Sequence, residues 1–147
     1  MAMENKDAKK KVLFICTHNA TRSQMAEGFI RALYDDRYEA YSAGTEPTRV
    51  DPCAITVMQD VGIDISTYRS KGLEEFDGQQ FDYVATLCAD AQESCPIFIG
   101  GQTYLHHAFD DPAHVKETIS ETDECSRFRT VRDQLRAWIE ATFGTAE

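Results

Sequence analysis

Short runs of apolar residues divide the chain into segments that have the pattern of strands. The first run, at 12–15 (VLFI), is continuously apolar, as expected of a strand buried on both faces. Residues 38–43 alternate between apolar and polar side chains, and residues 81–87 (FDYVATL) form a third run. A weaker fourth run covers 104–109. The pattern predicts four strands.

Amphipathic helices are predicted between and after these strands. The first begins near Ser23, where apolar residues recur at helical spacing. The second follows Asp51-Pro52, which offers an N-cap residue and a proline at the first helical position, and it ends at Gly62. The third lies beyond Ser120. This alternation predicts an α/β fold with a four-stranded parallel sheet flanked by helices on both faces.

Length and composition are those of one ordinary domain. The chain has 147 residues, of which 42% are hydrophobic and 27% charged. We expect a flexible N-terminal tail at 1–10, followed by a single catalytic domain at 11–147. In parallel sheets of this kind, ligands bind beyond the carboxyl ends of the strands, so the loops at that edge are the expected place for a site.

Charge and targeting signals exclude several classes of function. The 25 acidic residues outnumber the 15 basic ones, giving a net charge of −10. We therefore expect no nucleic-acid partner, which would require clustered Lys and Arg. No apolar run reaches the length of a membrane span, and the polar N-terminus lacks the apolar core of a signal peptide. These features predict a cytoplasmic protein without a membrane partner, whose five cysteines are free or catalytic thiols rather than a disulfide framework.

The loop after the first strand carries the strongest candidate site. It joins a buried strand to the start of a helix, where backbone N–H groups and the helix dipole favour an anion. Cys16 would be held there as a thiolate, Arg22 can grip a tetrahedral oxyanion through two N–H donors, and the Ser23 hydroxyl can hydrogen-bond the sulfur. The alternative is a buried cysteine that ends a strand, followed by a surface arginine. The candidate substrate-binding residues are Thr17, His18, Asn19, Ala20, Thr21, Arg22 and Ser23.

Four segments carry a resemblance to a known family. CTHNATRSQMAEG at 16–28 resembles the phosphate-binding loop of the low-molecular-weight tyrosine phosphatase fold. It is more similar still to that of the thioredoxin-coupled arsenate reductases, which share this fold. TLCADAQESCPI at 86–97, FDDPA at 109–113 and VRDQL in the last helix follow the reductase pattern in the same order. The resemblance implies reduction of arsenate to arsenite by a cascade of cysteine thiols, without metal or flavin.

The resemblance assigns the redox roles to three cysteines. Cys16 would be the nucleophile, and Cys88 and Cys95 the redox pair. From the residues alone, Cys88 ends the third strand at the same edge of the sheet as Cys16, so the two can approach each other. Two ordinary reduced cysteines, or half of a metal site completed by His106 and His107, remain alternatives. The six residues between Cys88 and Cys95 exceed the usual spacing of a zinc knuckle.

The loop at 110–112 supplies the candidate general acid. An Asp-Pro pair is by itself ordinary turn chemistry. In the fold that this chain resembles, the aspartate immediately before the proline protonates the leaving group, which makes Asp111 the candidate. The phosphatases usually place tyrosines after this pair, whereas this chain has Ala113 and His114. That departure favours reductase over phosphatase.

Substrate and partners follow from the resemblance. We expect arsenate as substrate, thioredoxin in preference to glutaredoxin as electron donor, no cofactor, and a monomer. Two alternatives stay open: a low-molecular-weight protein tyrosine phosphatase, and a non-enzymatic thiol module that binds arsenite or zinc. Cys53 and Cys125 fall in no matching motif and are expected to be incidental.

A cation site distinguishes some of the similar reductases. Several of them hold a potassium ion beside the anion loop, and Asn19, Glu27 and Ser42 match three of its ligand positions. Arg69 and Lys71 stand where those proteins have Thr and Asp. Our hypothesis is that Lys71 supplies a built-in positive charge near Glu27. The alternative is that both basic side chains simply point to solvent.

Overall fold

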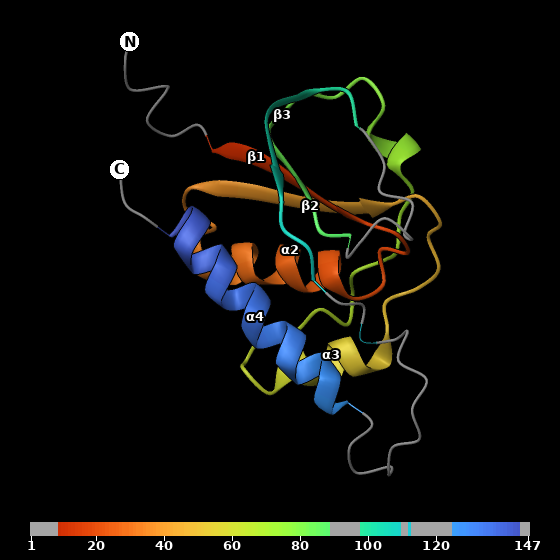
Figure 1. The fold of residues 1–147 in the computed structure, drawn as a ribbon, viewed down its shortest axis with the longest axis vertical. Helices are drawn as coiled ribbons and strands as arrows, with labels where there is room; N and C mark the ends of the chain where they lie inside the picture. Colours follow the sequence, from red (N-terminus) through yellow and green to blue (C-terminus); the bar gives the residue numbers. More distant parts are fainter. Residues whose placement is uncertain (1–8, 89–97, 110–111, 113–124, 145–147) are drawn as a thin grey trace.

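The computed structural model describes residues 9–88, 98–109, 112 and 125–144. Its centre is a four-stranded sheet in the order β2-β1-β3-β4, in which every neighbouring pair is parallel (Figure 1). The predicted four-stranded parallel sheet is therefore confirmed. The strands are β1 (Lys10–Cys16), β2 (Tyr38–Gly44), β3 (Phe81–Thr86) and β4 (Gly101–His106).

The central strand β1 is buried on both faces, as its apolar run predicts. Val12 and Phe14 belong to the core on one face, and Leu13 and Ile15 belong to the core on the other. Such double burial is typical of parallel sheets and requires a continuous rather than an alternating apolar run. The strand thus places Cys16, its last residue, at the edge of a well-packed core.

The helices cover the two faces unequally. The three α-helices of the described chain pack against the face that carries Val12 and Phe14, where the ribbon shows them together (Figure 1). The sequence pattern predicts helices on both faces; on the second face the structure describes a short 3-10 helix, η1, with Phe98 nearby. The helices are α2 (Arg22–Leu33), α3 (Pro52–Gln59) and α4 (Ser126–Phe143), and η1 covers Leu73–Phe76.

The register of the sheet brings the candidate loops to one edge. Cys16 pairs with Gly44 of β2, and its neighbour Ile15 pairs with Thr86 of β3. Thr86 in turn pairs with His106 of β4. Because all strands are parallel, the segments that follow them leave from the same side of the molecule.

Two boundaries show how local signals compare with the observed structure. Asp51 accepts a hydrogen bond from the backbone N–H of Cys53, and Pro52 begins α3, which confirms the predicted N-cap. In contrast, β4 begins at Gly101, three residues before the apolar run that predicts it. None of the helices in the described part of the chain is long and apolar enough to cross a membrane.

Candidate active site

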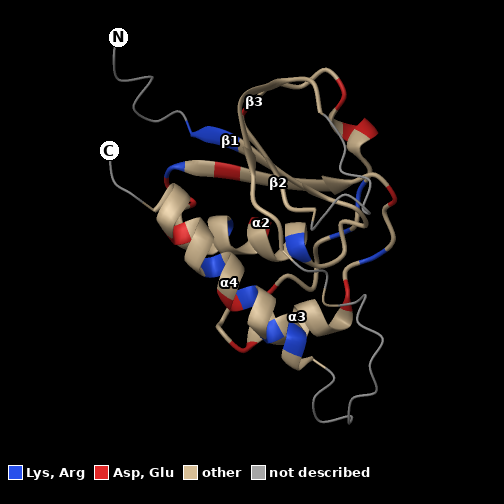
Figure 2. Ribbon diagram, in the orientation of Figure 1, with Lys and Arg blue, Asp and Glu red and all other residues tan. Residues whose placement is uncertain are grey.

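The segment from Cys16 to Ser23, hereafter the 16–23 loop, closes around a pocket at the carboxyl edge of the sheet. Cys16 and Arg22 are each only 2% exposed, and the first turn of α2 stands out as basic in Figure 2. The cavity has a volume of about 230 Å³, several times the roughly 30 Å³ that one water occupies in the liquid. Its lining consists of Cys16, His18, Ala20, Thr21, Arg22, Thr48, Arg49, Asp51 and Pro52.

A buried hydrogen-bond network orients the Ser23 hydroxyl toward the cysteine. The Ser23 Oγ lies 2.9 Å from the Cys16 sulfur and accepts a 2.8 Å bond from the Asn19 amide. The amide orientation is fixed because the backbone N–H of Lys71, which can only donate, bonds Asn19 Oδ1 at 2.8 Å. Whenever the Cys16 sulfur is a thiolate it can only accept, so the Ser23 hydroxyl then donates to it.

Gly44 gives the 16–23 loop the room to fold back over the end of β2. A Cβ at this position would lie 2.5 Å from the carbonyl oxygen of Thr17 and 2.8 Å from the backbone nitrogen of Asn19. Asn19 itself has a φ of 51°, in the left-handed region that asparagine tolerates better than most residues. The alternating pattern that predicts this strand ends at residue 43 and gives Gly44 no role, so this role was missed.

Thr21 presents a buried hydroxyl at the same pocket. The residue is 3% exposed and its Oγ1 has no hydrogen-bond partner among the residues that the structure describes. A buried hydroxyl without a partner is costly, so a donor of this kind on a pocket wall is suited to a bound oxygen. Thr21 therefore adds a side-chain donor to those expected from the loop backbone.

Arg22 connects the 16–23 loop to the segments that follow β3 and β4. Its Nη1 donates to the carbonyl of Phe109 at 3.0 Å and to that of Leu87 at 3.4 Å. These carbonyls immediately precede Asp110 and Cys88 in the chain. One guanidinium thus holds together the three loops that sequence analysis singles out.

Cys88 lies beside the 16–23 loop as a second buried thiol. It is 1% exposed, and neither Cys88 nor Cys16 is joined by a disulfide to another cysteine in the described part of the chain. The backbone N–H of Leu87 bonds the carbonyl of Ile15 at 2.9 Å, so the chain leading to Cys88 is paired with the chain leading to Cys16. Cys95 and Asp111 lie outside the described residues.

The far wall of the pocket comes from residues that no catalytic motif indicated. Thr48, Arg49, Asp51 and Pro52 line it, and the backbone N–H of Asp51 bonds the carbonyl of Ala20 at 3.0 Å. Pro52 begins α3 and the other three precede it; the sequence marks Asp51-Pro52 as a helix start and gives no sign of a role in binding. Only the packing of that connection against the 16–23 loop reveals them.

The remaining histidine candidates lie at the rim or away from the pocket. The His18 imidazole points to Glu46, 3.6 Å away, with a third of its side chain exposed. His106 bonds Thr86 at 2.7 Å, and His107 stacks on Phe109. Within the part of the chain that is described, no group of three or more His, Cys, Asp and Glu is arranged to hold a metal.

Lys71 lies partly buried within the electrostatic reach of Glu27. Burial lowers the pKa of Lys71, and the Glu27 carboxylate opposes this by raising it. The Lys71 Nζ also donates to the carbonyl of Arg69 at 2.9 Å. Glu27 is 5% exposed and accepts bonds from Ser42 at 2.6 Å and from Arg31 at 2.9 Å. This environment supports the hypothesis that Lys71 serves as a fixed cation.

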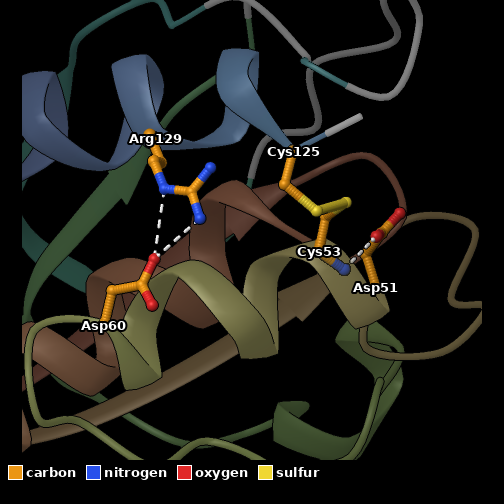
Figure 3. Close-up of a disulfide and its surroundings, with 5 residues drawn as sticks. All are labelled: Asp51, Cys53, Asp60, Cys125 and Arg129. Carbon is orange, nitrogen blue, oxygen red and sulfur yellow. Dashed lines mark hydrogen bonds and ion pairs between the residues drawn. A yellow bond between two sulfur atoms is a disulfide. The ribbon is translucent and has the colours of Figure 1, made fainter. Parts of the chain in front are cut away.

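The expectation that Cys53 and Cys125 are incidental is wrong. The two form a disulfide with their Cα atoms 5.3 Å apart, which links the start of α3 to the start of α4 (Figure 3). The general expectation of free thiols therefore fails for this pair. Their separation of 72 residues hides the pairing from any local pattern, because only the packing of α4 on α3 brings them together.

The comparisons with known proteins agree with this architecture. Arsenate reductase 1 of Staphylococcus epidermidis is 43% identical over 132 residues, which cover 90% of this chain and 94% of the relative. A solved arsenate reductase in the phosphate binding state superposes with a TM-score of 0.76 at 36% identity, covering 90% of this chain and 95% of that one. The thioredoxin-dependent arsenate reductase of Corynebacterium glutamicum gives 0.62 at 26% identity, covering 94% of this chain and 65% of that one.

The family itself is defined over almost the whole length of the chain. Residues 11–144 match the low molecular weight phosphotyrosine protein phosphatases, a span that begins in β1 and ends just after α4. The 16–23 loop, the buried arginine and the parallel sheet all lie within it. The chain therefore belongs to the low molecular weight phosphotyrosine protein phosphatase family.

Proposed function

We propose that this protein is an arsenate reductase that works through cysteine thiols and a thioredoxin-type reductant. The observation that carries the proposal is the second buried thiol, Cys88, on the chain paired beside Cys16. Hydrolysis of a phosphoester requires one nucleophilic cysteine, whereas reduction of arsenate requires a thiol that can attack the first sulfur. Relatives that are named arsenate reductases support the same reading.

The first step uses the geometry of the 16–23 loop. Arsenate binds in the pocket, where the Arg22 guanidinium and the loop N–H groups offset its charge. The Cys16 thiolate, stabilised by Ser23, attacks arsenic to form a sulfur–arsenic bond. One arsenate oxygen leaves as water after it is protonated, and we assign that proton to Asp111.

The redox step transfers two electrons to arsenic. The Cys88 thiolate attacks the sulfur of Cys16, the sulfur–arsenic bond breaks, and its electron pair leaves with arsenic as arsenite. Cys95 then attacks Cys88, which frees the Cys16 thiolate and leaves a Cys88–Cys95 disulfide. A dithiol of the thioredoxin type reduces this disulfide, so the sum is arsenate plus two thiols giving arsenite, water and one disulfide.

A coupled assay tests the activity and the donor together. Arsenate, thioredoxin, thioredoxin reductase and NADPH should give NADPH oxidation that depends on this protein, and a glutaredoxin system should give much less. The assignment of Cys95 has its own test. Cys95→Ser should release one arsenite per chain and stop with a Cys16–Cys88 disulfide, seen by peptide mapping. Continued turnover of that variant would overturn the role of Cys95.

Phosphatase activity is the second candidate, because the family and the 16–23 loop also suit a phosphoester. It differs in not needing Cys88, so hydrolysis of an aryl phosphate by Cys88→Ser alongside lost arsenate reduction separates the two. A thiol module that only binds arsenite or zinc would show tight stoichiometric binding and no turnover. We also propose that the protein acts as a monomer in the cytoplasm, where a reducing partner is available.

A further inference from the structure

The Cys53–Cys125 disulfide lies outside the chemistry proposed above, yet it joins two helices next to the pocket (Figure 3). Cys53 is the second residue of α3, and Cys125 is the N-cap residue of α4. The chain between them includes Cys88 and the Asp111 loop. The two cysteines take no part in the proposed electron path, so the question is what their bond controls.

Two hydrogen bonds connect this disulfide to the pocket wall. The Asp51 carboxylate accepts the backbone N–H of Cys53 at 2.9 Å (Figure 3). The backbone N–H of Asp51 in turn bonds the carbonyl of Ala20 in the 16–23 loop at 3.0 Å. Asp51, Pro52 and Ala20 all line the pocket. Asp51 therefore contacts both Cys53 and the 16–23 loop, so a shift of Cys53 would shift the wall of the anion site.

The opposite end of α3 is held to α4 without a covalent bond. Arg129 donates twice to the Asp60 carboxylate, at 3.1 and 2.9 Å, and Arg132 donates to the carbonyl of Val57 at 2.8 Å. These contacts do not depend on the redox state of the cysteines. Reduction of the disulfide therefore leaves these contacts at the C-terminal end of α3 in place and removes the covalent link at the N-terminal end, which carries the pocket wall.

The setting of both sulfurs favours exchange with a dithiol. Each cysteine lies at a helix N-terminus, where the helix dipole stabilises a thiolate and so makes it a better leaving group. Cys53 is 8% exposed and Cys125 is partly exposed, which leaves the pair accessible at one end. One disulfide and one dithiol give two protein thiols and the disulfide of the reductant, with two electrons and two protons passing to the protein.

We propose that the Cys53–Cys125 pair is a reversible thiol–disulfide site that sets the affinity of the pocket for its oxyanion. The disulfide holds Asp51 against the 16–23 loop, and reduction loosens that wall. The identity of the oxyanion as arsenate, and of the dithiol as a thioredoxin, rests on the function proposed above. The coupling between the disulfide and the pocket is independent of that function.

The test measures binding of inorganic phosphate to the full chain. Cys88 and Cys95 are both replaced by serine in this background chain, so that Cys16, Cys53 and Cys125 are the only cysteines left in the protein. Phosphate protection of Cys16 from iodoacetamide, followed by peptide mass spectrometry, gives a Kd in each redox state. Reduction should raise this Kd about fivefold, the lower end of typical coupling between two sites. Adding Cys53→Ser should give the weaker Kd with and without reductant.

Equal phosphate affinity in the oxidised and reduced protein would overturn the proposal, as would absence of a Cys53–Cys125 cross-link from the oxidised protein. Should Cys53→Ser not fold, Cys125→Ser replaces it, and reversible reduction of the background chain needs neither. Arsenate turnover is measured separately on the parent chain. A redox-dependent phosphate Kd without arsenate reduction refutes the proposed function alone, and arsenate reduction with a redox-independent Kd refutes this proposal alone.

Discussion

The molecule holds two pairs of cysteines in opposite structural settings. Cys16 ends β1 and Cys88 follows the neighbouring parallel strand β3, and both are buried thiols. Cys53 and Cys125 lie at the starts of two packed helices and are joined by a disulfide. In the first pair, the Ser23 hydroxyl hydrogen-bonds the Cys16 sulfur, whereas in the second pair Asp51 caps the helix that carries Cys53. The polar contacts of the first pair thus act on a thiol at the pocket, and those of the second pair act on the start of a helix.

The largest effect is expected from breaking the first pair. Cys16→Ser should abolish both arsenate reduction and any phosphoester hydrolysis, because a hydroxyl is a far poorer nucleophile than a stabilised thiolate. Cys88→Ser should abolish only the reduction. Arsenate-dependent NADPH oxidation and aryl phosphate hydrolysis measure the two activities side by side. Arsenate turnover by Cys88→Ser would show that the proposed electron path is wrong.

Breaking the second pair should cost stability in addition to the oxyanion affinity discussed above. The disulfide closes a loop of 72 residues, for which chain entropy gives a stabilisation of about 4 kcal/mol. In the Cys88→Ser, Cys95→Ser background, urea unfolding of the oxidised protein should therefore show a clearly higher free energy of unfolding than that of the reduced protein. Adding Cys53→Ser gives the matched control, since its stability should not respond to reductant. Identical unfolding of the oxidised and reduced background protein would contradict the prediction.

Gly44→Ala sharpens the comparison by disturbing the thiol environment without touching a sulfur. The added methyl would meet the Thr17 carbonyl and the Asn19 backbone, so overpacking should cost about 1–3 kcal/mol and most of the activity. Gly62→Ala provides the control. Its φ of 83° makes alanine strained there, but the added Cβ would have no atom within 4 Å apart from its neighbours in the chain. The control should lose stability and keep phosphate binding. Full phosphate affinity in Gly44→Ala would refute the role of this glycine.

The smallest effect concerns the cation beside the 16–23 loop. If Lys71 supplies the positive charge near Glu27, arsenate kinetics should be the same in sodium and potassium salts of equal ionic strength. Lys71→Asp should introduce a dependence on potassium, whereas Lys9→Asp, next to Asp35, should not. Potassium-specific activation or thermal stabilisation of the parent would rule the idea out.

The pH dependence of this effect has a definite direction. Burial lowers the pKa of Lys71, and Glu27 offsets part of that shift. The ammonium is therefore lost at a lower pH than that of an exposed lysine, and with it the fixed positive charge. The arsenate kinetics should therefore be independent of potassium at neutral pH and become dependent on it as the pH rises into the alkaline range.

Sequence patterns predicted the parts of the fold that depend on neighbouring residues. The apolar run of β1 and the Asp51-Pro52 helix start are local signals, and both elements form as expected. The start of β4 at Gly101 was missed because β4 is an edge strand with exposed polar residues, whose ladder bonds to β3 form without an apolar pattern. Backbone pairing, not side-chain burial, sets that boundary.

The sequence predicts the motif of the candidate site, but not the distant residues that hold the motif in place. Cys16, Arg22 and Ser23 lie within eight residues and carry a recognisable pattern, and the structure brings them to one pocket or one hydrogen-bond network. The role of Gly44 and the partnership of Cys53 with Cys125 depend on chain segments that are distant in sequence. No periodicity records how closely two backbones approach or which helices will pack.

The contacts of Arg22 link the anion pocket to the segment that carries Cys88. Its guanidinium lines the oxyanion pocket and also bonds the carbonyl of Leu87, the residue before Cys88. In the proposed reaction Cys88 moves toward the sulfur of Cys16. The segment that moves is therefore hydrogen-bonded to the arginine that lines the anion pocket, so anion binding and the redox step share one side chain.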